Sequence, residues 1–144
     1  DTCDANLVVD QTEYTVGDDI ALHLFSDASS CEGHLASPDS FVGIYQADIA
    51  VDEIWGDANY ETFLWTCGSQ SCHSSNVVNE FVFGRETLMD AWHLPEGRYK
   101  AHLVVPNGRR FRSVAQSDVF EVSEALTSQV SSQTLFVFYW LVKE

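Results

Sequence analysis

Cysteine and histidine are the residues of this chain that could bind a metal ion or carry a nucleophile. Two short stretches, Cys31-Glu32-Gly33-His34 and Cys72-His73, place thiol and imidazole groups at spacings that zinc accepts. The paired C-x-x-C units of a zinc ribbon are missing, however, so disulfides explain the cysteines better. The chain also has no nucleophile elbow, no P-loop and no Gly-x-Gly-x-x-Gly motif. We therefore expect a protein that is not an enzyme and needs no cofactor.

The four cysteines are an even number, which is typical of disulfides. Of the three possible pairings we favour Cys67 with Cys72, which closes a short loop, and Cys3 with Cys31. Chain-entropy arguments give the second bridge about 3.6 kcal/mol of stabilisation. Paired cysteines suit an oxidising compartment, and the chain begins at Asp1 without an apolar leader, so we expect a processed, secreted protein.

A cluster of carboxylates is the better metal candidate. Asp48, Asp52, Glu53 and Asp57 crowd one loop, and hard cations such as calcium favour clustered carboxylates. No EF-hand spacing appears, and a solvated acidic loop is the simpler interpretation. We therefore predict no metal and keep these four residues as weak calcium candidates.

Charge is distributed unevenly along the chain. Residues 1–84 contain fifteen acidic residues and no Lys or Arg, so the whole net charge of -15 lies in this part. Such a field repels phosphate, so we do not expect nucleic acid as a partner. Five basic residues predict a basic patch, which is either ordinary solvated surface or a surface that meets the acidic face of another copy. They are Arg98, Lys100, Arg109, Arg110 and Arg112.

Short alternating runs between turn signals predict an all-β fold, an antiparallel β-sandwich. Ile20, Leu22 and Leu24 alternate on one face of their run. Asn107-Gly108 favours a tight hairpin turn. No segment has a sustained helical period. We expect seven strands, over residues 6–10, 20–25, 41–45, 62–66, 77–83, 99–105 and 111–122.

The most specific local signal is Leu94-Pro95-Glu96-Gly97-Arg98-Tyr99, which has the spacing of a tyrosine corner. In such a corner the Tyr hydroxyl bonds back to upstream backbone, here with Leu94 and Gly97 as the framing residues. Antibody domains have a Cys two residues after this Tyr, but here the position is Ala101. The usual disulfide between the sheets is therefore absent. We expect Trp92 to pack under the corner as part of the core.

The chain from residue 39 to 122 resembles the SKICH-like and related immunoglobulin-like and fibronectin type III-like sandwiches. The resemblance rests on residues 39–45, 60–65, 92–99 and 113–117 leading into Phe120, which occur in the family's order. SKICH-like domains are non-catalytic modules used for targeting and association, so the resemblance implies a binding or scaffolding role. A looser similarity to the N-terminal sandwich of purple acid phosphatases points the same way. The disulfide-capable loop, the acidity and the tail depart from the SKICH-like pattern.

The chain ends in an apolar run, Leu135-Phe136-Val137-Phe138-Tyr139-Trp140-Leu141-Val142. It is too short to span a bilayer, which takes about 20 residues as a helix, and its composition predicts a buried strand. We divide the chain into a sandwich (1–122), a polar linker (123–134) and this additional C-terminal strand (135–144). The buried face is Phe136, Phe138, Trp140 and Val142, or the opposite set, because a one-residue slip exchanges the faces.

Three interpretations of this strand compete. It completes its own sheet, it begins a longer segment, or it completes the sheet of a neighbouring copy. Twelve extended linker residues reach about 40 Å, which is enough to cross to another subunit. A contact of that kind joins two different surfaces, so it repeats from copy to copy without forming a closed ring. We therefore expect an extracellular filament made of this chain alone. The alternative function is a monomeric extracellular binding module for glycan or calcium, using the acidic loop with Trp55 and Tyr60.

Overall fold

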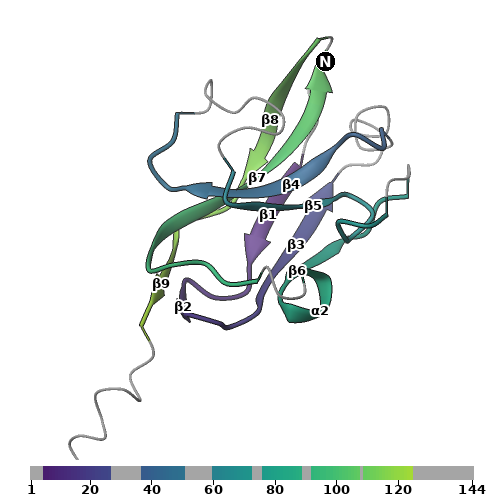
Figure 1. Ribbon diagram of the computed structural model, residues 1–144. Coiled ribbons are helices and arrows are strands. Elements are labelled where there is room, and N and C mark those ends of the chain that lie inside the picture. The colour runs from purple at the N-terminus through teal and green to yellow at the C-terminus, as the bar shows by residue number, and fades with distance from the viewer. Residues whose placement is uncertain are drawn as a thin grey trace, which may run out of the picture.

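Two β-sheets face each other in the computed structural model of this chain, which describes residues 5–26, 37–50, 60–72, 76–88, 92–107 and 109–124 (Figure 1). The smaller sheet is antiparallel and has the order β1 (Ala5–Val9), β3 (Ile20–Ser26), β6 (Glu80–Phe83). The larger sheet has the order β2-β9-β7-β4-β5, and β8 also pairs with β7. Its strands are β2 (Glu13–Thr15), β4 (Phe41–Gln46), β5 (Thr62–Trp65), β7 (Gly97–Asn107), β8 (Arg110–Gln116) and β9 (Phe120–Ser123).

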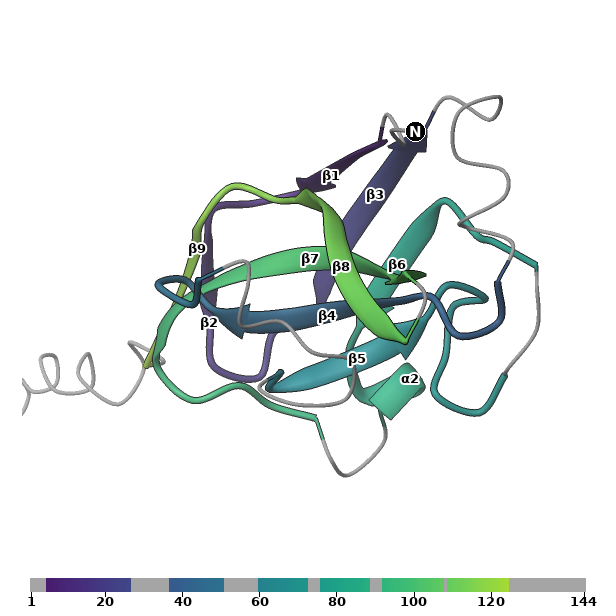
Figure 2. The ribbon, with the colours of Figure 1, turned by 90° about the horizontal axis from the view of Figure 1, so that it is seen from above.

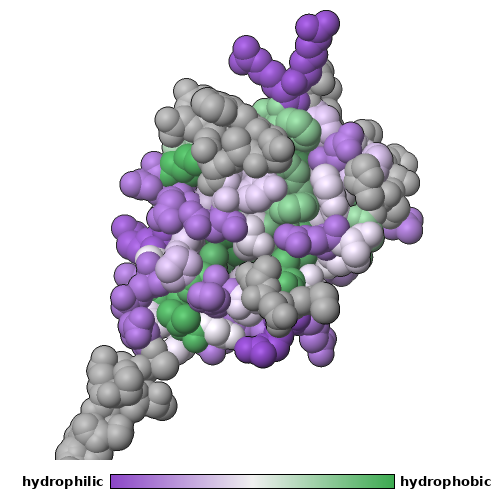
Figure 3. Space-filling view, viewed as in Figure 1, coloured by the Kyte–Doolittle hydropathy of each residue, from purple (hydrophilic) through white to green (hydrophobic). Residues whose placement is uncertain are grey.

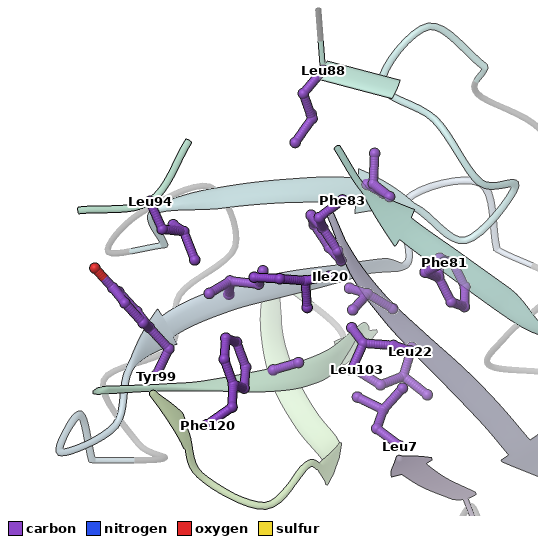
Figure 4. Close-up of a cluster of buried hydrophobic side chains, with 14 of the residues drawn as sticks. Leu7, Ile20, Leu22, Phe81, Phe83, Leu88, Leu94, Tyr99, Leu103 and Phe120 are labelled. Atoms are coloured by element: carbon purple, nitrogen blue, oxygen red, sulfur yellow. The ribbon is translucent and has the colours of Figure 1, made fainter. Parts of the chain in front are cut away.

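The predicted all-β sandwich is confirmed, and the alternating residues form its core. Ile20, Leu22 and Leu24 of β3 are at most 5% exposed. They meet side chains of the opposite sheet, including Leu103 and Phe120 (Figure 4). Because apolar residues of both sheets point into one cluster, their burial holds the sheets together.

The described residues contain nine strands and one helix, rather than seven strands. The short β2, which is not among the expected strands, runs parallel to β9 with Tyr14 opposite Val122. The expected strand over 77–83 is shorter and begins at Glu80. The helix α2 covers only Arg85–Leu88, a length at which no helical period can be recognised in the sequence.

The expected strand over 111–122 is divided into β8 and β9, both on the same side of β7 (Figure 2). The hydrogen-bond ladder along β7 is interrupted at Ser117. There the serine side chain, rather than a backbone carbonyl of a neighbouring strand, bonds to the β7 backbone. Its Oγ accepts the backbone N–H of Ala101 at 2.9 Å and donates to the carbonyl of Asp118 at 2.9 Å. Its backbone N–H donates to the Ala101 carbonyl. The interruption therefore leaves no buried backbone group of Ala101 unsatisfied.

The hairpin between β7 and β8 closes at the pair Asn107 and Arg110, so the predicted hairpin is confirmed. At the other end of β7, the hydroxyl of Tyr99 donates to the Pro95 carbonyl at 2.6 Å, which is the bond of a tyrosine corner. Tyr99 is fully buried against Phe120. Gly97 leaves room for this ring, because a Cβ at Gly97 would lie 3.2 Å from the Tyr99 hydroxyl.

Candidate functional site

Many of the residues that sequence reasoning singled out lie outside the described ranges. These are the C-terminal strand 135–142, Cys3 and Cys31, Trp55, and the calcium candidates Asp52, Glu53 and Asp57. Asp48 is described and lies exposed in the turn after β4. Within the described ranges, no group of three His, Cys, Asp or Glu side chains is placed to hold a metal ion.

One of the two expected disulfides lies in the described part of the chain. Cys67 and Cys72 are bonded to each other and close the loop after β5. Gly68 adopts a φ of 107° in this loop, a backbone conformation that favours glycine. The Oγ of Ser69 accepts the backbone N–H of Cys72 at 3.0 Å, which fixes the second cysteine.

The five basic residues do not form one patch. Arg98 lies opposite Glu121 at the beginning of β7, whereas Arg110 lies opposite Asn107 at its end. Nine residues of extended strand separate these positions, which is about 30 Å. Lys100, next to Arg98, donates from Nζ to Oε1 of Gln116 at 3.0 Å. The basic charge is therefore divided between two ends of the sheet.

A second apolar cluster covers the outer face of the larger sheet. Phe41 is 4% exposed, and its ring lies 5.8 to 6.3 Å from four other aromatic rings. Tyr45 and Val104 are fully buried beside it. The surrounding rings are partly buried and come from β5, β8 and the segment before β5: Tyr60, Phe63, Trp65 and Phe111.

Of this aromatic cluster, sequence reasoning named only Tyr60, although a signal for the rest exists. Phe41-Val42-Gly43-Ile44-Tyr45 is an uninterrupted apolar run, which is typical of a strand buried on both faces. Val42 and Ile44 point into the core between the sheets, while Phe41 and Tyr45 point outward. Gly43 allows the Tyr45 ring to lie flat on the strand, because a Cβ there would be 2.8 Å from Cε1 of that ring.

Two polar side chains are buried in this cluster. His102 is 1% exposed, and its ring meets the Tyr45 ring edge-on at a centroid distance of 5.3 Å. Burial lowers the pKa of His102 to about 4, with Lys100 as a second cause, and burial also raises the pKa of Tyr45. Neither Tyr45 Oη nor His102 Nε2 has a hydrogen-bond partner in the described part of the chain.

His102 also pairs with a side chain of β8. The His102 Nδ1 lies 2.9 Å from Ser113 Oγ, and the same Oγ lies 3.2 Å from the carbonyl oxygen of Ala115. The Ser113 hydroxyl can donate to the Ala115 carbonyl while it accepts from Nδ1–H, which satisfies both groups and links β7 to β8.

A groove lies between β1 and the end of β8, which packs close to β1. We call it the β1 groove; it has a volume of about 410 Å³ and is lined by residues 6–9, Thr12, Phe25, Gln116 and Asp118. Val8 and Phe25 are 47% and 59% exposed and lie on the paired strands β1 and β3, where they form a small apolar surface. The Phe25 ring stacks on His23 at 6.3 Å. The apolar part of the lining comes from β1 and Phe25, whereas Asn6, Thr12, Gln116 and Asp118 contribute polar groups.

The surface in the view of Figure 3 is mainly hydrophilic and is interrupted by apolar residues. No helix in the described ranges combines the length and the apolarity that crossing a bilayer takes. No known family model matches the sequence, and no curated protein is significantly similar to it.

Proposed function

We propose that this chain is a secreted, non-enzymatic structural subunit that associates with copies of itself. In this proposal the apolar segment 135–142 of one copy is added as a strand to a sheet of the next copy. The proposal is supported by two features together: the core between the sheets is already filled, and the edge of the smaller sheet at β1 exposes apolar side chains. The described strands bury one common core and end at Ser123, while the β1 groove exposes Val8 and Phe25.

The core is filled without a further strand from residues 135–142. Its residues are at most 7% exposed and come from both sheets and from α2. Apolar residues 135–142 are therefore surplus to this core, and an exposed apolar strand is an aggregation hazard unless it is paired. Adding the strand to a sheet edge satisfies its backbone hydrogen bonds and covers its side chains together.

The energetics permit this association. Burying four alternating large apolar side chains contributes roughly 6 to 12 kcal/mol before the cost of ordering the segment. Because β9 ends at Ser123, the chain between the described sandwich and the apolar segment is residues 125–134. Ten extended residues reach about 35 Å, which still exceeds the radius of a domain of this size, about 14 Å. A neighbouring copy is thus within reach.

Deleting residues 131–144 tests the proposal. We expect the full chain to assemble with rising concentration and the truncated chain to remain a folded monomer. Sedimentation velocity measures the size of both, and circular dichroism checks the fold. The variant Phe138→Asp with Trp140→Asp keeps the full length and should also be monomeric, whereas the polar-segment control Ser131→Ala with Ser132→Ala should assemble. Equal sizes for the full and truncated chains would exclude strand donation.

A monomeric binding module is the second candidate, and the aromatic cluster favours it. Tyr60, Phe63 and Trp65 place three partly buried rings on one sheet face, with ring centroids 5.1 and 5.2 Å apart. Such a platform suits stacking against a flat, partly apolar ligand such as a glycan. The resemblance of residues 39–122 to SKICH-like association modules, which rests on sequence motifs alone, agrees with either candidate. A full chain that stays monomeric and binds an immobilised glycan would favour the module.

A further inference from the structure

We infer that the β1 groove is the acceptor site for residues 135–142 of a second copy, with β1 as the strand that they pair with. This inference rests on the proposed function and goes further, because it assigns the receiving edge and the backbone groups that form the ladder. It depends on the hydrogen-bond pattern of β1, on the composition of the competing edges, and on the direction in which the chain leaves the sandwich.

The hydrogen-bond pattern identifies which backbone groups of β1 are directed away from β3. The Asp10 N–H donates to the Ala21 carbonyl at 3.1 Å, and the register continues as Val8 with His23 and Asn6 with Phe25. Residues of an antiparallel strand alternate between the partner and the opposite side. The N–H and C=O groups of Leu7 and Val9 are therefore directed away from β3, toward the groove that Gln116 and Asp118 line on the other side.

The pairing on the other side of β3 agrees with this assignment. The Leu24 N–H donates to the Asn79 carbonyl at 2.8 Å, so the even-numbered residues of β3 bond to the β6 side. The backbone groups of the odd-numbered residues of β3 therefore bond to β1, which agrees with the bond from Asp10 to Ala21. Among the described strands, β1 pairs with β3 alone. A strand added to β1 would thus bond to Leu7 and Val9.

The side chains at this edge match an apolar strand. Leu7 points into the core and is 4% exposed, while Val8 lies on the outer face beside Phe25 and is 47% exposed. An added strand would place alternate residues over the Leu7 side and over the Val8 side. Both faces of segment 135–142 are apolar, so both would be covered at this edge.

The other edges are less suitable. Strand β6, the other edge of the smaller sheet, has four residues and begins with the charged Glu80. Strand β8 carries Arg110 and Arg112, and charged side chains discourage pairing at an edge. Strand β2 has only three residues. Strand β5 has four and runs into the loop that the Cys67–Cys72 bond closes. The five residues of β1 carry no charge and expose a large apolar side chain.

The direction of β9 favours a second copy over the chain's own tail. Asp118 lines the groove, but the strand that follows it leads the chain to Ser123, which lies opposite Thr15 at the far end of β2. Figure 1 shows β9 leaving the sandwich beside β2. The linker must reverse its direction to reach its own β1, whereas it needs no reversal to reach a neighbour.

Hydrogen exchange of single amides tests the receiving edge. In the full chain under assembling conditions, we expect the amides of Leu7 and Val9 to exchange at least tenfold more slowly than in the chain lacking residues 131–144. The amide of Val8 is bonded to β3 in both forms, so its exchange serves as the internal reference. Unchanged exchange at Leu7 and Val9, together with loss of assembly on truncation, would overturn the edge assignment and leave the proposed function standing.

A mixing experiment tests the source of the strand. Isotope-labelled truncated chain is mixed with unlabelled full chain, and only the labelled amides are read. We expect Leu7 and Val9 of the truncated chain to become protected, because the strand arrives from another molecule. Protection that appears only in labelled full chain at monomeric concentrations would show that the tail occupies its own groove, and would overturn the second-copy assignment.

Two lysine variants test the edge independently. Val8→Lys places a charge in the groove, and Val77→Lys places the same charge at an exposed valine outside it, which is 39% exposed. We expect Val8→Lys to raise the concentration for half-assembly at least tenfold and Val77→Lys to leave it unchanged. Equal effects of the two variants would contradict the assignment of β1.

Discussion

His102 shows what a single buried titratable residue does to this sandwich. The pKa of its ring is lowered from 6.5 to about 4, so the ring stays neutral in the folded chain while it becomes charged in the unfolded chain. Between these two values the unfolded state binds the additional proton, and the free energy of unfolding falls as the pH falls. Between pH 7 and pH 4, the His102 pKa shift lowers the free energy of unfolding by about 3 kcal/mol.

Replacing His102 by Gln should therefore flatten the pH dependence of stability. The variant removes the group that titrates differently in the two states, so the wild type should lose about 3 kcal/mol more than His102→Gln when the pH falls from 7 to 4. Urea unfolding at both pH values measures the difference. His93→Gln, at an exposed position, is the matched control. Parallel losses in the wild type and His102→Gln would contradict the assigned burial effect.

At the scale of the elements, Ser117 determines where the last long strand is interrupted. We expect Ser117→Ala to destabilise the fold by about 1 to 3 kcal/mol, because the buried N–H of Ala101 loses its acceptor. Chemical denaturation measures this loss. Ser123→Ala, at the exposed end of β9, is the control and should change stability by less than about 0.5 kcal/mol. A Ser117→Ala variant as stable as this control would show that water replaces the serine.

A comparison of β3 with the interrupted strand shows how far the sequence predicts the fold. The alternation of Ile20, Leu22 and Leu24 indicates a strand with one buried face, and that burial follows from local pattern alone. The interruption at Ser117 depends instead on a side chain that meets Ala101 sixteen residues away, which no local pattern reveals. The separation of Arg98 from Arg110 likewise depends on the length of β7. Spacing in the sequence could predict the strands, but not which charges share a surface.

At the scale of the whole molecule, the net charge of -15 opposes contact between copies. The basic residues offer little compensation, since they are divided between the two ends of β7. The proposed strand contact, in contrast, would be apolar and insensitive to screening. Association should therefore be governed by an apolar attraction that works against a long-range repulsion.

Salt should strengthen assembly if this balance holds. The screening length falls from about 30 Å at 0.01 M to about 10 Å at 0.1 M ionic strength, so repulsion between acidic copies weakens while strand pairing persists. We expect the concentration for half-assembly, followed by light scattering, to fall several-fold over this range. Weaker assembly at higher salt would instead mean that Arg110 and its basic neighbours attract the acidic face of the next copy. The sign of the salt effect thus separates a contact made by the apolar strand from one made by complementary charge.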